Sequence, residues 1–146
     1  MSQENVELVR RASEALNRAI ANDDLTPALL DLLDQDIDWR AAEGAIDDVG
    51  GMRGHDAIRR YLEDWTDGFD NLTLVPQELL EIDDEQVMAV QRLSGRAKQT
   101  GIETELTFFA IYTIREGRFV KVREYITREE ALEAVGLSEQ DAHADS

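Results

Sequence analysis

The sequence contains no cysteine, which excludes disulfides, thiol catalysis, zinc–thiolate sites and iron–sulfur clusters. Basic residues are also few, 15 against 32 acidic ones, which gives a formal charge of −17 at pH 7. An electrostatic field of this sign repels phosphate backbones and anionic lipid headgroups. We therefore expect neither nucleic acid nor a membrane surface as a partner.

Long hydrophobic runs are absent as well, since no stretch approaches the roughly 18–20 apolar residues that a membrane-spanning helix requires. The segment Met1–Val6 has neither the basic nor the apolar region of a secretory signal, so we expect a cytoplasmic protein. The chain has 146 residues, 42% of them hydrophobic and 32% charged, which is typical of one soluble globular domain. We expect the domain to span residues 1–137, with a disordered polar tail at 138–146.

The first half of the chain has the apolar spacing of helices. Apolar residues recur on one face of residues 4–21, and Ile58, Tyr61, Leu62 and Trp65 lie on one face of a helix from about His55 to Asp67. Between them, Thr26 and Pro27 are typical of the start of a short helix over residues 28–33. A short strand is predicted over Ile37–Arg40, and residues 43–54, with four glycines, are predicted to be a loop.

The second half alternates in the manner of strands, which we place near residues 72–82, 86–98, 103–115 and 118–126. Pro76 indicates an edge or a bulge, and Glu116-Gly117 indicates a tight hairpin turn. Thr127–Glu130 has capping-box spacing before a short C-terminal helix that Gly136 ends. This order predicts an α+β fold, with helices on one face of a curved antiparallel sheet.

The third of these strands is apolar on both faces. Phe108, Ala110 and Tyr112 share one face with Leu106 and Ile114, whereas Phe109 and Ile111 lie on the other. We expect the helices to cover the first face and a second subunit to cover the other. The sequence thus predicts a homodimer packed through the sheet.

Several segments together resemble a known family. They are the opening helix Asn5–Asn17, the turn Asn22–Leu25, Ile37-Asp-Trp-Arg40, Arg53–Arg60 after a glycine-rich loop, and the closing Arg128–Leu132. This series resembles the SnoaL-like, or polyketide-cyclase-like, branch of the NTF2-like superfamily, which includes the ketosteroid isomerases. The resemblance covers residues 4 to about 137. It implies a cone of about three helices packed on a strongly curved antiparallel sheet, an apolar pocket between them, and a homodimer.

The resemblance also allows the catalytic positions of the ketosteroid isomerases to be compared. Those enzymes use a tyrosine on the first helix, an aspartate base after the first strand and a protonated aspartate on a late strand. An ungapped comparison places Ala12, then Ala41 or Ala42, then Phe108–Ala110 at these positions. None of these residues can ionise, so we do not expect isomerase chemistry by that set.

Seven residues are candidates for the pocket. Trp39 and Arg40 fit an aromatic wall and a cation for an anionic or carbonyl group, although Trp39 could equally pack the core and Arg40 pair with an exposed acid. The other five are Tyr61, Trp65, Phe108, Tyr112 and Arg123. As alternatives, the two helical aromatics could be core residues, and Arg123 could join Arg92 and Glu105 in a cross-strand cluster.

Catalytic residues cannot be assigned from the sequence, and the weak candidates are His55 and Arg40. His55 could act as a general acid–base or be a partly solvated residue at a helix end. We expect no metal and no cofactor, because no ligand spacing or phosphate-binding loop is present. Two functions remain open: binding of a small, largely apolar molecule or a partner without catalysis, or an isomerase, cyclase or hydrolase acting on a polycyclic or terpenoid-like substrate. A third reading is that side chains fill the cavity and the sheet face only mediates assembly.

Overall fold

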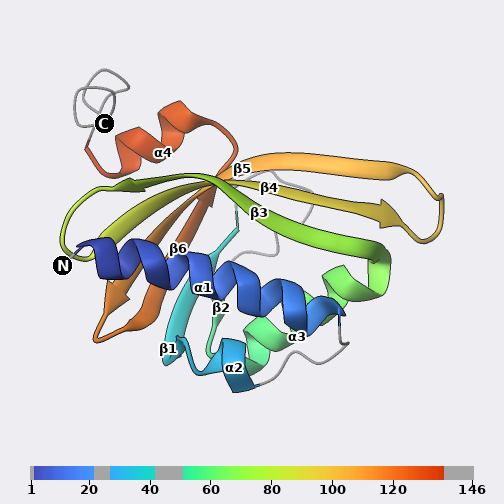
Figure 1. Ribbon diagram of the computed structural model, residues 1–146, viewed down its shortest axis with the longest axis horizontal. Coiled ribbons are helices and arrows are strands. Elements are labelled where there is room, and N and C mark those ends of the chain that lie inside the picture. The colour runs from blue at the N-terminus through green and yellow to red at the C-terminus, as the bar shows by residue number, and fades with distance from the viewer. Residues whose placement is uncertain (1, 22–26, 42–50, 137–146) are drawn as a thin grey trace.

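A computed structural model describes residues 2–21, 27–41 and 51–136 of the chain (Figure 1). The elements, in order, are α1 (Ser2–Ala21), α2 (Pro27–Leu30), β1 (Leu33–Arg40), β2 (Gly51–Arg53), α3 (His55–Gly68), β3 (Phe69–Glu81), β4 (Gln86–Ala97), β5 (Glu103–Arg115), β6 (Arg118–Tyr125) and α4 (Arg128–Ala134). The predicted α+β class is confirmed. The predicted tail at 138–146 and the predicted cap at Thr26 lie outside the described residues.

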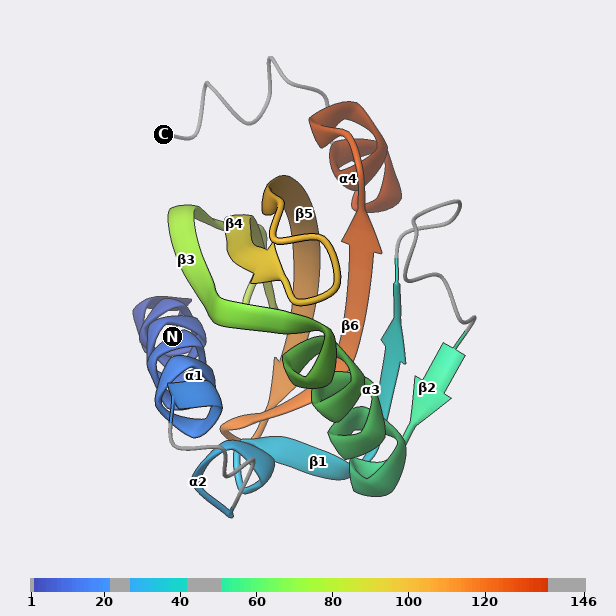
Figure 2. The ribbon, with the colours of Figure 1, turned by 90° about the vertical axis from the view of Figure 1, so that its right-hand side faces the viewer.

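The strands form one six-stranded sheet in the order β2-β1-β6-β5-β4-β3. The sheet is strongly curved, and α1, α2 and α3 lie on the inner side of the curve (Figure 2). Every described pair is antiparallel except β1 with β6, which is parallel. The predicted antiparallel sheet therefore has one parallel junction, because β1 lies between β2, its neighbour in sequence, and β6, the last strand.

Three predicted boundaries near the start of the sheet were wrong. The second helix ends at Leu30 and the strand after it already begins at Leu33, because Leu33 is buried and pairs with Phe119 on β6. The predicted loop over 43–54 contains β2, whose Met52 is buried and pairs with Trp39. A strand this short is set by its pairing with β1 rather than by any period of its own.

Two local predictions about turns and edges are confirmed. Glu116 and Gly117 both have positive φ, 52° and 75°, and join the paired residues Arg115 and Arg118, as a two-residue hairpin turn requires. Pro76 lies on the edge strand β3 beside a register shift between Pro76 and Glu78. Proline fits there because an edge position beside an irregularity loses little from a missing N–H.

The main core lies between the helices and the inner face of the sheet. Val9 of α1 and Ile58 of α3 are buried against Ile37, Val87 and Val122 of the strands. All five side chains are at most 1% exposed. Burying apolar side chains from helices and sheet in one cluster holds the cone together.

A second, smaller core lies on the outer face of the sheet, under α4. Ala131 and Leu132 pack there against Met88 and Ile111, and Thr127 caps the helix by accepting from the Glu130 N–H. From the sequence we expect a second subunit to cover this face of β5. The structure shows that α4 of the same chain covers at least the part around Ile111.

Candidate functional site

A cavity of about 680 Å³ lies between α1, α3 and the inner face of the sheet. Its walls come from nearly every element of the cone, and most of its lining residues are apolar. The aliphatic residues among them are Val9, Ala12, Leu16, Ile20, Leu29, Leu33, Leu62, Leu72, Leu74, Leu93, Leu106, Val122 and Ile126. The volume falls in the range of roughly 300–1,000 Å³ typical of small-molecule sites.

Aromatic side chains are concentrated in the walls of this cavity. Seven of the nine aromatic residues of the chain line it: Trp39, Tyr61, Trp65, Phe69, Phe108, Tyr112 and Phe119. Six of them form three ring pairs with centroid distances of 5.2 to 6.3 Å. Such pairs hold each other's orientation, so the walls present flat, fixed apolar surfaces.

The polar residues of the lining include Gln91 and Tyr112, besides Ser13, Ser94, Thr104 and three acidic residues. Gln91 is 1% exposed, and the Tyr112 hydroxyl donates to its Oε1 at 3.0 Å. Burial, and secondarily the charge of Glu124, raises the pKa of Tyr112 well above its usual range. Tyr112 therefore stays protonated at neutral pH and acts as a hydrogen-bond donor rather than as a base.

Two buried donors have no partner among the described residues. They are the side-chain N–H groups of Gln91 (Nε2) and Trp39 (Nε1). Buried polar groups in folded proteins nearly always have a hydrogen-bond partner. Both residues line the cavity, so its wall includes two side chains whose donors the described protein atoms leave unsatisfied.

The charged residues of the lining are all acidic. They are Asp64 and Glu105, which are exposed, and Glu124, which is half-buried on β6. Glu105 is bonded to Arg92 of β4. Among the residues that the structure describes, no arginine, lysine or histidine lines the cavity, so an anionic ligand would find no cationic partner in these walls.

The structure brings together five of the seven predicted pocket residues: Trp39, Tyr61, Trp65, Phe108 and Tyr112 all line the cavity. Arg40 and Arg123 are not in its lining, and neither is His55. Each arginine directly follows a cavity-lining residue on its strand, Trp39 on β1 and Val122 on β6. Because successive side chains of a strand point to opposite faces, the two arginine side chains point to the outer face of the sheet. Whether the five residues bind a ligand stays a prediction.

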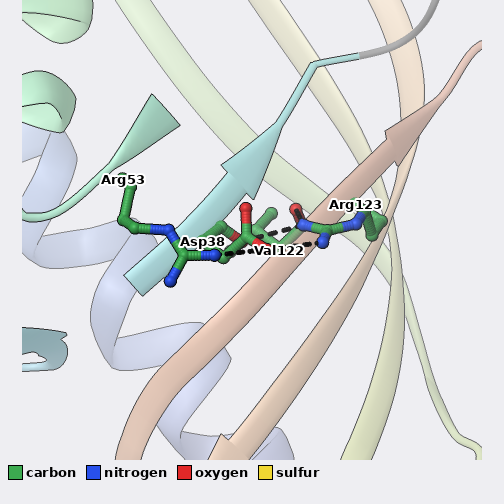
Figure 3. Close-up of polar contacts among 4 residues, drawn as sticks. All are labelled: Asp38, Arg53, Val122 and Arg123. Atoms are coloured by element: carbon green, nitrogen blue, oxygen red, sulfur yellow. Dashed lines mark hydrogen bonds and ion pairs between the residues drawn. The ribbon is translucent and has the colours of Figure 1, made fainter. Parts of the chain in front are cut away.

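Arg123 joins β6 to β1 on the outer face (Figure 3). Its guanidinium donates to the Asp38 carboxylate at 2.8 Å and to the Asp38 and Val122 carbonyl oxygens at 2.9 and 3.0 Å. Arg53 lies 3.5 Å from the same carboxylate. The proposed cluster of Arg123 with Arg92 and Glu105 is therefore wrong, because Arg123 pairs with Asp38 while Arg92 pairs with Glu105.

The two weak catalytic candidates have other surroundings in the structure. The exposed Arg40 guanidinium lies beside Gly51 of β2, 3.5 Å from the position that a Cβ atom would occupy at this glycine. His55 begins α3 and is half-buried, with Nε2 2.9 Å from the Leu33 carbonyl oxygen. Because a carbonyl oxygen only accepts, Nε2 carries a proton and ties α3 to β1.

Sequence reasoning missed Gln91 and did not place Glu124 in the pocket. Gln91 directly follows the buried run Val87–Val90, and a polar residue at an inward position of such a strand was a usable signal. Of the positions compared with the isomerases, Ala12 and Phe108 line the cavity, Phe109 packs near α4, and Ala42 lies outside the described residues.

The described residues contain neither a cluster of metal ligands nor a helix that could span a membrane. Within residues 2–21, 27–41 and 51–136, no group of three or more histidine, cysteine, aspartate or glutamate side chains could hold a metal ion. None of the helices in the same residues combines the length and hydropathy needed to cross a bilayer.

The family model of the SnoaL-like domain matches residues 9–122, most of the described cone. The chain belongs to the SnoaL-like family. The match includes most of α1, all of α2, α3 and β1 to β5, and most of β6, so it covers nearly all the elements that line the cavity. No curated protein sequence matches this SnoaL-like chain.

Solved structures resemble the SnoaL-like chain over most of its length. An NTF2-like protein from Burkholderia xenovorans LB400 is 25% identical, with a TM-score of 0.68 over 87% of this chain and 92% of that one. A protein from Catenulispora acidiphila DSM 44928 with a ketosteroid isomerase-like fold, in complex with trimethylamine, is 17% identical, with a TM-score of 0.67 over 90% and 93%. TerC, co-crystallised with polyporic acid, is 19% identical, with a TM-score of 0.68 over 90% and 98%. These likenesses show the NTF2-like fold.

Proposed function

We propose that this SnoaL-like protein binds a small, largely apolar molecule in the cavity, without the catalytic set of the ketosteroid isomerases. The observation that carries the proposal is the cavity itself, about 680 Å³ in volume and walled mainly by aliphatic and aromatic side chains. Protein interiors are otherwise packed as densely as organic crystals. An opening of this size removes contacts that the core would otherwise make, and a bound apolar molecule restores them.

Two of the neighbours support the idea that this fold accommodates small molecules. One was solved in complex with trimethylamine and another was co-crystallised with polyporic acid. In this chain, the pocket residues that we propose for ligand contact are Trp39, Tyr61, Trp65, Phe108 and Tyr112, which line the cavity.

The alternative is an enzyme, an isomerase, cyclase or hydrolase acting on a polycyclic or terpenoid-like substrate. The observation that favours it is the presence of Glu124 and Tyr112 in the same lining. A carboxylate can accept a proton from a substrate, and a buried neutral phenol can donate a hydrogen bond to a substrate oxygen. Conversion of a bound compound, lost in Glu124→Gln with binding retained, would establish this function in place of simple binding.

Binding can be tested with 1-aminoanthracene, an uncharged dye whose emission rises in apolar surroundings. We expect it to bind the wild-type protein. The variant Ala12→Trp should lose the binding, because a large side chain on α1 would occupy the cavity. The matched control Ala134→Trp is on the exposed side of α4 and should bind as the wild type does. Equal binding by both variants, or none by the wild type, would contradict the proposal.

Native mass spectrometry of freshly purified protein gives a complementary readout. A mass increment that is present in the wild type and absent in Ala12→Trp would identify the chemical class of the bound molecule.

We also propose that residues 1–137 form a single domain, that the protein is cytoplasmic, and that it is a homodimer packed through the outer face of the sheet.

A further inference from the structure

We propose that the molecule bound in the cavity is uncharged and presents an oxygen atom that accepts a hydrogen bond from Nε2 of Gln91. This inference rests on the function proposed above and specifies the class of ligand. A ketone, ester or ether oxygen on an otherwise apolar skeleton fits the description, whereas a pure hydrocarbon or a carboxylate does not.

The side-chain amide of Gln91 has one bonded end and one end without a partner among the described residues. Its Oε1 accepts the hydrogen bond of Tyr112 at 3.0 Å, so the opposite end of the amide, Nε2, is the free donor. That nitrogen is buried, and no described residue accepts from it. A buried donor without a partner is unfavourable, and a ligand that supplies an acceptor removes the penalty while a hydrocarbon leaves it.

Tyr112 fixes the position of that donor. The tyrosine is itself 8% exposed and lies on β5, next to the strand of Gln91. Because its pKa is raised, it remains a donor to Oε1 over the physiological range. With Oε1 bonded to Tyr112, the Gln91 amide has its Nε2 without a partner among the described residues before any ligand enters. Trp39 Nε1 is a second buried N–H without a partner among the described residues.

The charges of the cavity lining disfavour an anionic ligand. An anionic oxygen would also accept from Gln91, but the charged side chains around the cavity are Asp64, Glu105 and Glu124, all acidic. The protein as a whole carries a formal charge of −17. Moving a carboxylate into this field and away from water is costly without a cation to pair with it. The acceptor is accordingly an uncharged oxygen.

Three naphthalene derivatives of similar size separate these possibilities. They are 2-acetylnaphthalene, a ketone; 2-isopropenylnaphthalene, in which a methylene group replaces the carbonyl oxygen; and 2-naphthoate, an anion. Each is titrated against the complex of the full-length protein with 1-aminoanthracene, and its affinity is obtained from displacement of the dye. We expect the ketone to bind about ten-fold more tightly than the isopropenyl compound, and 2-naphthoate to bind most weakly.

The role of Gln91 is tested by Gln91→Met, which keeps the side-chain length and removes the N–H donor. The preference for the ketone should fall toward equality in this variant. It should persist in the control Gln77→Met, an exposed position on β3 outside the cavity. If Gln91→Met fails to fold, the three affinities of the wild-type protein still decide the ligand class.

The outcomes also separate this inference from the function on which it rests. Equal affinity for the ketone and the isopropenyl compound would overturn the inference, because a bound water would then satisfy Gln91 whichever ligand is present. Tightest binding of 2-naphthoate would overturn it as well. In both cases the cavity would still bind apolar molecules. Failure of 1-aminoanthracene to bind the wild-type protein would instead overturn the proposed function.

Discussion

Asp38 illustrates how a single side chain on the outer face supports the parallel junction of the sheet. The Arg123 guanidinium donates a hydrogen bond to the Asp38 carboxylate and holds its pKa below the usual value of 3.8, and the charges of Arg53 and Arg40 lower it further. A carboxyl whose pKa is depressed in the folded state stabilises that state above its unfolded pKa. This stabilisation disappears as the pH falls through the lower, folded pKa.

Replacing Asp38 by asparagine should therefore destabilise the protein in a pH-dependent way. At pH 7 we expect Asp38→Asn to lower the free energy of unfolding by about 1–2 kcal/mol, because the bonds to Arg123 are charge-assisted and partly buried. As the pH falls below 3.8 and then through the lower pKa of the folded state, the difference from wild type should shrink, since Asp38 becomes protonated in both states. Urea unfolding at a series of pH values from 7 downward measures this. Asp67→Asn, an exposed position on α3, serves as the control, and an equal effect of both variants would contradict the assignment.

Elements that owe their form to local patterns could be predicted from the sequence. The long strands β3 to β6 follow from their alternation, and α4 follows from its capping box, because the signals lie within each segment. The placement of β1 beside β6 could not be predicted, since it depends on contacts between distant segments. The orientation of Arg123 was missed for a related reason. Strand register decides which side chains face the cavity. In the pairing of β5 with β6 the register shifts between Thr113 and Ile114, and alternation within one strand does not reveal such a shift.

The helix α4 contributes a small core of its own on the outer face of the sheet. Leu132 is 1% exposed and packs with Met88 and Ile111. Leu132→Ala should lower the free energy of unfolding by about 2–4 kcal/mol through the cavity that it creates. The adjacent, exposed Glu133→Ala should change it by less than about 0.5 kcal/mol.

Chemical denaturation measures both variants, and dye titration shows whether the helix influences the ligand cavity. Because α4 lies on the outer face of the sheet, the folded Leu132→Ala protein should bind 1-aminoanthracene with unchanged affinity. A loss of dye binding in this variant would show that the two faces of the sheet are energetically coupled.

The charge of the whole molecule bears on the proposed homodimer. Each copy carries a formal charge of −17, so two copies repel one another at distances within the Debye length. The outer face offsets this locally, because Arg40, Arg53 and Arg123 surround the single carboxylate of Asp38 there. An apolar association through the sheet must overcome the remaining repulsion.

Salt should therefore strengthen the dimer. We expect sedimentation velocity to show a lower dimer dissociation constant in 300 mM than in 20 mM NaCl, because the Debye length shortens from roughly 20 Å to about 6 Å over this range. Weaker association at high salt would indicate an interface held by attraction between charges. A monomer under both conditions would contradict the homodimer.

The parallel pairing of β1 with β6 also has a consequence for the order in which the protein can be made. Asp38 and Arg123, which bond across this junction, are 85 residues apart in the chain. Trp39 on β1 and Val122 on β6 meet in the same place, so the wall of the cavity is complete only when the last strand arrives. Contacts this distant form late in folding. In a chain emerging from the ribosome, β1 must remain without this partner until β6 has been synthesised.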